Sequence, residues 1–227
     1  EWINGRLVIF SAFWFYTNQP DITYNSQLSG PIPNSIVNWT NITSLGLGLG
    51  RFDGLLTGTV DILSNLSNLE SLRIQNNNFD EVDFPSSIFN LVNLKTLYFA
   101  KNNFTGEIST DISKLTNLEY FWAGENKLTG YIPTEIWQNS KLKTFGVERN
   151  NLMGELPDFN MFTLDNLYWL NLNDNNLSGE IPNSICQLHT LMNNLDQGEG
   201  YFYNGNWIYD NYFDISNNKF CPNSQSD

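Results

Sequence analysis

The chain has 227 residues and a formal net charge of −13, from 24 acidic and 11 basic side chains. This excess of negative charge repels phosphate backbones and anionic lipid headgroups, so nucleic acids and acidic membranes are excluded as expected partners. A basic secreted or cell-wall partner matches the charge better. No Pro/Ser/Gly-rich linker divides the chain, and we expect one domain, 1–227.

Residues 1–25 do not follow the pattern of the rest and are predicted to form an N-terminal cap. They include an apolar run at 7–16, which is shorter than the roughly 20 residues of a membrane-spanning helix. The run has no clear small-residue cleavage site, which argues against a signal peptide. A strand or helix that closes the open end of a core is the interpretation we favour, and no membrane insertion is expected.

Residues 26–188 are built from a repeat whose period is set by a recurring asparagine. The asparagines at 77, 102, 126, 150 and 175 are spaced by 25, 24, 24 and 25 residues. Each is the asparagine of the frame L-x-x-L-x-L-x-x-N-x-L. A fixed period of this length is typical of a solenoid of about seven stacked units.

Within each frame, two apolar residues two positions apart predict a strand with one face in the core. Successive units run in the same direction, so we expect one short strand per unit, joined in a parallel sheet. The recurring asparagine is expected to bond backbone groups where the chain turns, and replacing it by leucine to cost on the order of 1–3 kcal/mol. These structural asparagines are Asn77, Asn102, Asn126, Asn150, Asn175 and, in the last unit, Asn218.

A Leu-x-Gly-x-Ile/Leu-Pro phrase occurs four times, at 28–33, 128–133, 152–157 and 177–182, and the last three continue a frame. Its glycine permits a tight turn or a positive φ, and its proline fixes an extended segment. The pattern resembles the plant-specific leucine-rich repeat of receptor-kinase ectodomains and polygalacturonase-inhibiting proteins, which also occurs in secreted bacterial proteins. The resemblance implies an α/β solenoid: a right-handed superhelix with a parallel sheet on its concave face, 3-10 or irregular convex segments and capped ends.

Residues 189–227 are predicted to hold an atypical last repeat with an insertion and a C-terminal cap. In the insertion, aromatic residues flank Asn204-Gly205, a strong hairpin signal. The hairpin is interpreted either as a lid on the last core layer, which we favour, or as an aromatic finger that grips a ligand. Cys186 and Cys221 flank the last unit and favour a disulfide, with two free buried thiols as the alternative.

The residues between and beside the strand apolars point outward and form the expected binding face. Exposed aromatics beside polar groups are typical of recognition hot spots, although they could also pack together only to stiffen the sheet. Gly124 and Gly146 are expected to leave a groove beside them. The candidate ligand-binding residues are Tyr98, Tyr120, Trp122, Glu148, Arg149, Trp169, Asn171, Asn173 and Asp174.

Catalytic and metal-binding patterns are weak in this chain, which has one histidine, His189. Glu148 and Asp174 form a remote candidate for an acid/base pair. The acidic group Asp80, Glu81 and Asp83 lacks the spacing of a calcium loop, so a solvated turn is favoured. We therefore expect no enzyme, no cofactor and no metal.

The expected function is extracellular, receptor-like recognition of a protein or peptide on the concave face, by a secreted protein or an ectodomain. The first alternative is a structural or adhesive cell-surface or matrix protein that self-associates. The second is carbohydrate binding, with a glycan as partner.

Overall fold

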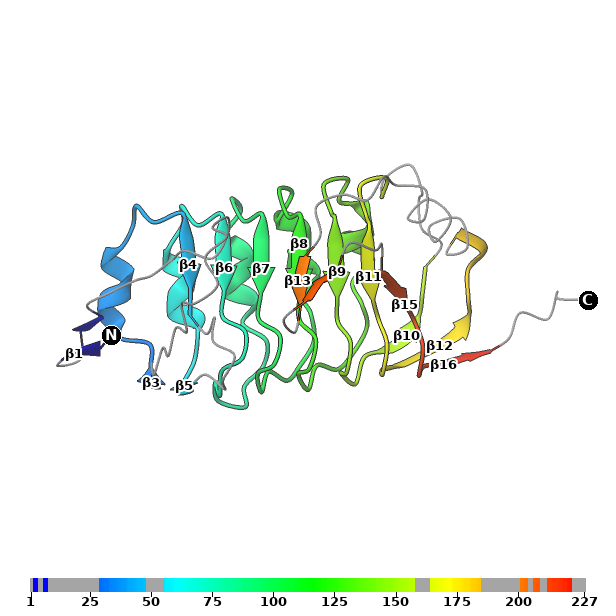
Figure 1. Cartoon of the computed structure of the whole chain (residues 1–227), viewed down its shortest axis with the longest axis horizontal. Helices are drawn as coiled ribbons and strands as arrows, with labels where there is room; N and C mark the ends of the chain where they lie inside the picture. The colour runs from blue at the N-terminus through cyan, green and yellow to red at the C-terminus, as the bar shows by residue number, and fades with distance from the viewer. Residues whose placement is uncertain are drawn as a thin grey trace, which may run out of the picture.

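The computed structural model describes residues 2–3, 6–7, 29–47, 55–157, 164–184, 201–203, 206–208 and 212–221. Between the ends, the repeats stack side by side into an elongated array (Figure 1). No helix among these residues is long and apolar enough to cross a membrane.

Seven parallel strands form the main sheet, one from each repeat, in the order β15-β11-β9-β8-β7-β6-β4. Equivalent repeat positions pair across it, so that Phe121 lies beside Leu97 on one side and Phe145 on the other. The parallel sheet predicted from the frame is therefore confirmed. The strands are β4 (Ser44–Gly46), β6 (Ser71–Arg73), β7 (Thr96–Tyr98), β8 (Tyr120–Trp122), β9 (Thr144–Gly146), β11 (Trp169–Asn171) and β15 (Tyr212–Asp214).

Among the described residues, the return segments of five repeats each contain one short 3-10 helix. Each helix places one or two apolar side chains in the core, such as Ile112 in η4 and Ile136 in η5. Neighbouring helices of the series contact one another, so this layer repeats with the same period as the sheet. The helices are η1 (Asn34–Asn38), η2 (Asp61–Asn65), η3 (Ser86–Asn90), η4 (Thr110–Lys114) and η5 (Thr134–Gln138).

A second set of strands runs along the flank of the array, where the Leu-x-Gly segments lie. β3 (Ser29–Pro31) pairs with β5 (Leu55–Thr57), and β10 (Met153–Glu155), β12 (Asn176–Glu180) and β16 (Lys219–Cys221) form a three-stranded parallel sheet. Isolated parallel bridges, such as that between Tyr131 and Met153, link other repeats in between. The prediction of one strand per unit was wrong, because the Leu-x-Gly segment is extended too.

The two turn features predicted for the repeat are present. Gly130 of the Leu-x-Gly-x-Ile-Pro phrase has φ of +73°, in the left-handed region that favours glycine. Asn126 is buried and donates hydrogen bonds to the carbonyl oxygens of Phe99 and Ala123 at 3.1 and 3.0 Å. Its Oδ1 accepts from the backbone N–H of Phe104 at 3.2 Å, so one side chain ties together two repeats. Asn126 thus bonds backbone groups where the chain turns.

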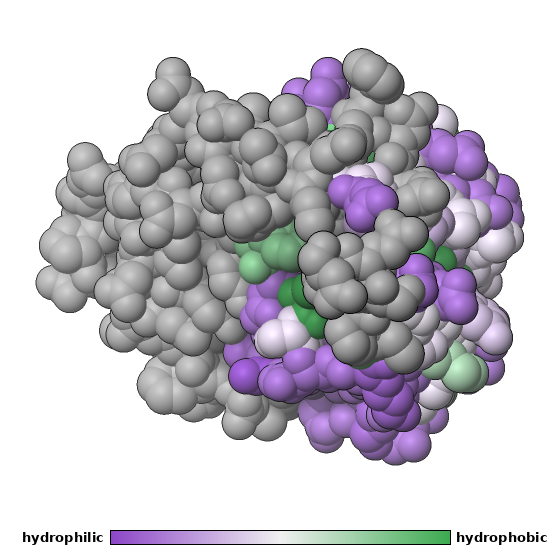
Figure 2. Space-filling view, turned by 90° about the vertical axis from the view of Figure 1, so that its right-hand side faces the viewer, coloured by the Kyte–Doolittle hydropathy of each residue, from purple (hydrophilic) through white to green (hydrophobic). Residues whose placement is uncertain are grey.

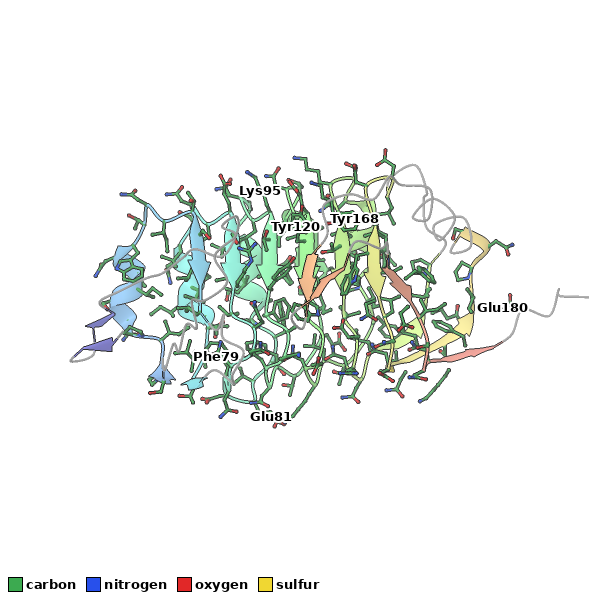
Figure 3. The ribbon with its side chains drawn as sticks, viewed as in Figure 1. Phe79, Glu81, Lys95, Tyr120, Tyr168 and Glu180 are labelled. Atoms are coloured by element: carbon green, nitrogen blue, oxygen red, sulfur yellow. The ribbon has the colours of Figure 1, made fainter. Side chains whose placement is uncertain are left out.

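The core is rich in phenylalanine in the central repeats. Phe121 is fully buried and its ring lies 5.3 Å from that of Phe145 and 5.4 Å from that of Phe99. Figure 3 draws the described side chains, with Tyr120 labelled in the upper half of the array and the buried Phe79 in the lower half. Seen from its C-terminal end, the described surface is mostly hydrophilic (Figure 2).

Two antiparallel pairs are described by their backbone only, and the second is drawn in front of β8 and β9 in Figure 1. β1 (Trp2–Ile3) pairs with β2 (Arg6–Leu7), and β13 (Tyr201–Tyr203) pairs with β14 (Asn206–Ile208). The second pair joins Tyr203 to Asn206, which confirms the hairpin predicted around Asn204-Gly205. Most of the cap at 1–25 lies outside the described residues, as does Cys186, so the disulfide stays a prediction.

Candidate functional site

The candidate site lies on the outward side of the main sheet. We call this side the sheet face and define it by the residues that flank and alternate with the buried strand apolars. In β8, for example, Phe121 points into the core while Tyr120 and Trp122 stay partly exposed on the sheet face. All the binding residues predicted from the sequence belong to the sheet face or to the turns at its edge.

Aromatic rings on the sheet face contact one another and neighbouring cations. The rings of Tyr98 and Trp122 meet edge to face at 5.9 Å. The Arg73 guanidinium lies 5.4 Å from the centre of the Tyr98 ring, and the Lys143 ammonium lies 5.5 Å from that of Tyr120. These distances allow cation–π attraction. Burial raises the pKa of Tyr98 to about 12, so its hydroxyl stays protonated at neutral pH.

The space above the two sheet-face glycines is filled by side chains from neighbouring repeats. A Cβ added to Gly146 would overlap the Trp169 ring and come within 2.9 Å of Cδ1 of Trp122. A Cβ added to Gly124 would overlap the Glu148 carboxylate. The prediction of a groove at these glycines was therefore wrong. Trp169 and Trp122 pack against Gly146, and Glu148 packs against Gly124.

Glu148 is the buried acid of the sheet face, with 6% of its surface exposed. Its Oε1 accepts a hydrogen bond from the Trp122 indole N–H at 2.8 Å. Its Oε2 is buried and has no hydrogen-bond partner among the described residues. Burial raises the pKa of Glu148, and the Trp122 hydrogen bond opposes this in part.

Arg149 and Asp174 lie at the turns that end their strands, each with φ of +52°. Nε of Arg149 is 3.5 Å from Asp174 Oδ2, and its Nη1 is 3.6 Å from Glu125 Oε1. Asp174 also accepts a hydrogen bond from Asn217 at 2.7 Å. Glu148 and Asp174 thus each have other partners, and nothing in this geometry favours the acid/base pair considered from the sequence.

The two sheet-face asparagines belong to one hydrogen-bonded chain. Asn171 is buried, and its Oδ1 accepts from the backbone N–H of Asn173 at 3.3 Å. The Asn173 amide then donates to Asp214 Oδ2 at 2.7 Å. This chain extends the polar part of the site from β11 to β15.

The acidic turn near residue 80 shows ordinary polar partners. Asp80 accepts from the Gly58 N–H at 3.0 Å, Glu81 pairs with Lys127, and Asp83 accepts from the Thr105 hydroxyl at 3.2 Å. Among the residues that the structure describes, no group of three or more His, Cys, Asp or Glu is placed to hold a metal ion.

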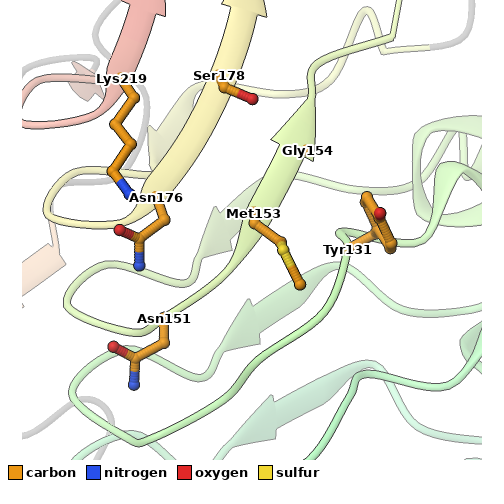
Figure 4. Close-up of a pocket in the computed structure, with 7 residues that line it drawn as sticks. All are labelled: Tyr131, Asn151, Met153, Gly154, Asn176, Ser178 and Lys219. Atoms are coloured by element: carbon orange, nitrogen blue, oxygen red, sulfur yellow. The ribbon is translucent and has the colours of Figure 1, made fainter.

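A shallow pocket on the flank was not anticipated from the sequence (Figure 4). It has a volume of about 580 Å³ and includes Tyr131, Met153 and Lys219 in its wall. Tyr131 and Met153 are 63% and 47% exposed, which is unusual for large apolar side chains here. Their sequence position could have indicated this exposure, because each lies next to the glycine of a Leu-x-Gly phrase.

Replacing Glu148 by glutamine is expected to stabilise the protein more at pH 7.5 than at pH 4. The folded-state pKa lies above the reference value of 4.5. Stability linked to Glu148 is therefore present below the unfolded-state pKa and lost as the pH rises through the folded-state pKa. Glutamine carries no charge and removes this loss. Urea unfolding at both pH values measures the difference, and a Glu148→Gln effect independent of pH would contradict it. The control Glu119→Gln removes a carboxylate paired with Lys143 at 2.9 Å and is not expected to stabilise.

Comparison with known proteins agrees with this geometry. The family model for the leucine-rich repeat matches residues 68–91, 93–115 and 166–188. The repeats form a leucine-rich-repeat solenoid. Its repeats are of the plant type, as the Leu-x-Gly-x-Ile-Pro phrase indicates.

Several of the similar proteins are receptors. Over 101 residues the chain is 36% identical to phytosulfokine receptor 1 of Arabidopsis thaliana, a stretch that covers 42% of this chain and 10% of the receptor. The structure of a TDR receptor is similar with a TM-score of 0.68 and 27% identity, covering 85% of this leucine-rich-repeat chain and 29% of that one. The structure of the plant peptide hormone receptor RGFR1 in complex with RGF2 is similar with a TM-score of 0.67 and 29% identity. The match covers 85% of this chain and 27% of that one. The chain therefore spans less than a third of these receptors.

Proposed function

We propose that this leucine-rich-repeat protein is a non-catalytic, extracellular recognition module that binds a protein or peptide on its sheet face. The observation that carries the proposal is the packing of Trp122 and Trp169 over Gly146, with Tyr98 edge to face against Trp122 and the Glu148 carboxylate hydrogen-bonded to Trp122. Partly exposed aromatics whose positions are fixed by packing bind with little loss of conformational freedom. Polar side chains around these aromatics can fix the orientation of a bound partner through hydrogen bonds.

The similarity to receptor ectodomains supports the same class of partner. RGFR1 is a plant peptide hormone receptor whose structure contains RGF2, and the similar structure of the Arabidopsis receptor kinase HAESA contains the peptide hormone IDA and the co-receptor SERK1. HAESA is 27% identical with a TM-score of 0.58, covering 86% of this chain. An extracellular or cell-surface location is proposed on the same ground.

The double variant Trp122→Ala/Trp169→Ala is expected to weaken binding to the native partner at least roughly tenfold, because buried aromatic anchors dominate binding energies. The assay is affinity capture from the native extracellular fraction, followed by titration of the captured partner. Circular dichroism and Tm show whether the variant is folded.

The matched control is Tyr131→Ala, which removes an exposed aromatic from the flank instead of the sheet face. We expect it to capture the same partner as the unaltered protein. Equal capture by the folded double variant would overturn the proposal. If only self-association or glycan binding is found in all three proteins, the structural or carbohydrate-binding alternatives take its place.

A further inference from the structure

Three unsatisfied acceptor oxygens fall at one position of the repeat. Among the described residues, the buried side-chain oxygens without a hydrogen-bond partner are Oε1 of Gln75, Oε2 of Glu148 and Oδ1 of Asn173. Each of these residues follows the second apolar residue of its frame, so all three stand in one row across the sheet face. Buried polar atoms are nearly always paired, because leaving them unpaired is costly. Their concentration in a single row indicates that this row meets hydrogen-bond donors.

Two of the three acceptors are neighbours. β9 and β11 pair Gly146 with Asn171, which places Glu148 beside Asn173 two residues further on. The backbone hydrogen bond from Arg149 N–H to Asn173 O, at 2.9 Å, fixes this register. The backbones of the two residues are therefore about 4.8 Å apart, the spacing of adjacent strands. Because the Asn173 NH₂ group donates to Asp214, its Oδ1 is committed to accepting.

Among the described residues, Arg149 and Lys143 near this pair are engaged with other carboxylates. Arg149 lies within 3.6 Å of Glu125 and Asp174, and Lys143 lies 2.9 Å from Glu119. The side-chain donor to Glu148 is the Trp122 indole N–H, which is neutral. A negative carboxylate in a protein of net charge −13 attracts a cation from outside.

We propose that Glu148 and Asn173 form an acceptor pair that binds an arginine side chain of the partner, seated against the Trp122 and Trp169 rings. A guanidinium presents several N–H donors in one plane, which suits two oxygens on adjacent strands. Its face also stacks on tryptophan. This proposal rests on the proposed function and specifies the chemistry of the partner group that the sheet face recognises.

The test uses N-acetyl-arginine methylamide as the probe and N-acetyl-citrulline methylamide as its uncharged isostere. The readout is the NMR signal of the Trp122 indole N–H, which bonds to Glu148. We expect the arginine probe to shift this signal saturably and the citrulline probe to bind about tenfold more weakly or worse, since hydrogen bonds between charged partners are the stronger ones.

Variants locate the contact. Glu148→Gln keeps the shape and an acceptor for Trp122 but removes the charge, and it is expected to weaken arginine binding about tenfold or more. Asn173→Ala is expected to weaken it less, because the neutral acceptor contributes less than the charged one. Glu119→Gln, whose carboxylate is paired with Lys143, is expected to leave the titration unchanged.

No saturable shift, an equal response to citrulline, or an unchanged titration in Glu148→Gln would each overturn the inference. A lysine probe, N-acetyl-lysine methylamide, that binds more tightly than arginine would also overturn it. If the arginine titration fails but Trp122→Ala/Trp169→Ala loses partner capture, the proposed function stands and only the arginine proposal is removed. Unchanged capture in that double variant would remove both.

Discussion

Replacing Asn150 by leucine is expected to lower the free energy of unfolding by about 3 kcal/mol. The buried Asn150 amide donates to the carbonyl oxygens of Ala123 and Val147 at 3.1 and 3.0 Å and accepts from the Leu128 N–H at 2.9 Å. Leucine makes none of these bonds and leaves buried backbone groups of two repeats without a partner. Urea unfolding measures the loss.

The next residue provides the matched control for this substitution. Asn151 is exposed and lies on the flank, so Asn151→Leu is expected to change stability by less than about 0.5 kcal/mol. Similar losses of stability in the two variants would mean that the recurring asparagines do not hold the repeats together.

Phe121→Ala is expected to cost about 3–5 kcal/mol, the range found when a buried phenylalanine is truncated. Phe121 has no exposed surface and lies between Phe99 and Phe145, so the cavity would open at the centre of the array. Adjacent repeats depend on each other for stability, so the loss is expected to reach both neighbours. Chemical denaturation gives the magnitude, and hydrogen exchange in β7 and β9 shows how far it spreads.

The control Phe121→Leu keeps most of the volume and is expected to cost less than about 1.5 kcal/mol. A loss below about 1 kcal/mol in Phe121→Ala would contradict the continuous core described here.

The frame of the repeat predicted most of the fold, because its chemistry is local and is used many times. The spacing of the strand apolars predicted the sheet and its register, and Asn204-Gly205 predicted the hairpin between β13 and β14. The flanking strands were missed because Leu-x-Gly contains a single apolar residue beside a glycine. Alternation, the strand signal, does not appear in so short a segment.

The sequence indicated which side chains lie on the sheet face but not what they contact there. Positions in the frame show which side chains face outward, but the direction in which a long side chain lies depends on its neighbours. Trp169 therefore lies over Gly146, and Glu148 over Gly124, where a groove was expected. The burial of Glu148 and its bond to Trp122 result from packing between repeats. The sequence of a single frame carries no information on such packing.

The central claim is that the sheet face, and not the flank, meets the partner. Photo-crosslinking tests it most directly, with p-benzoylphenylalanine placed at Tyr120 on the sheet face or at Tyr131 on the flank, and exposure to the native extracellular fraction. The account predicts one discrete crosslinked partner from position 120, suppressed by Trp122→Ala/Trp169→Ala, and none from position 131. A partner captured from position 131 alone would contradict it.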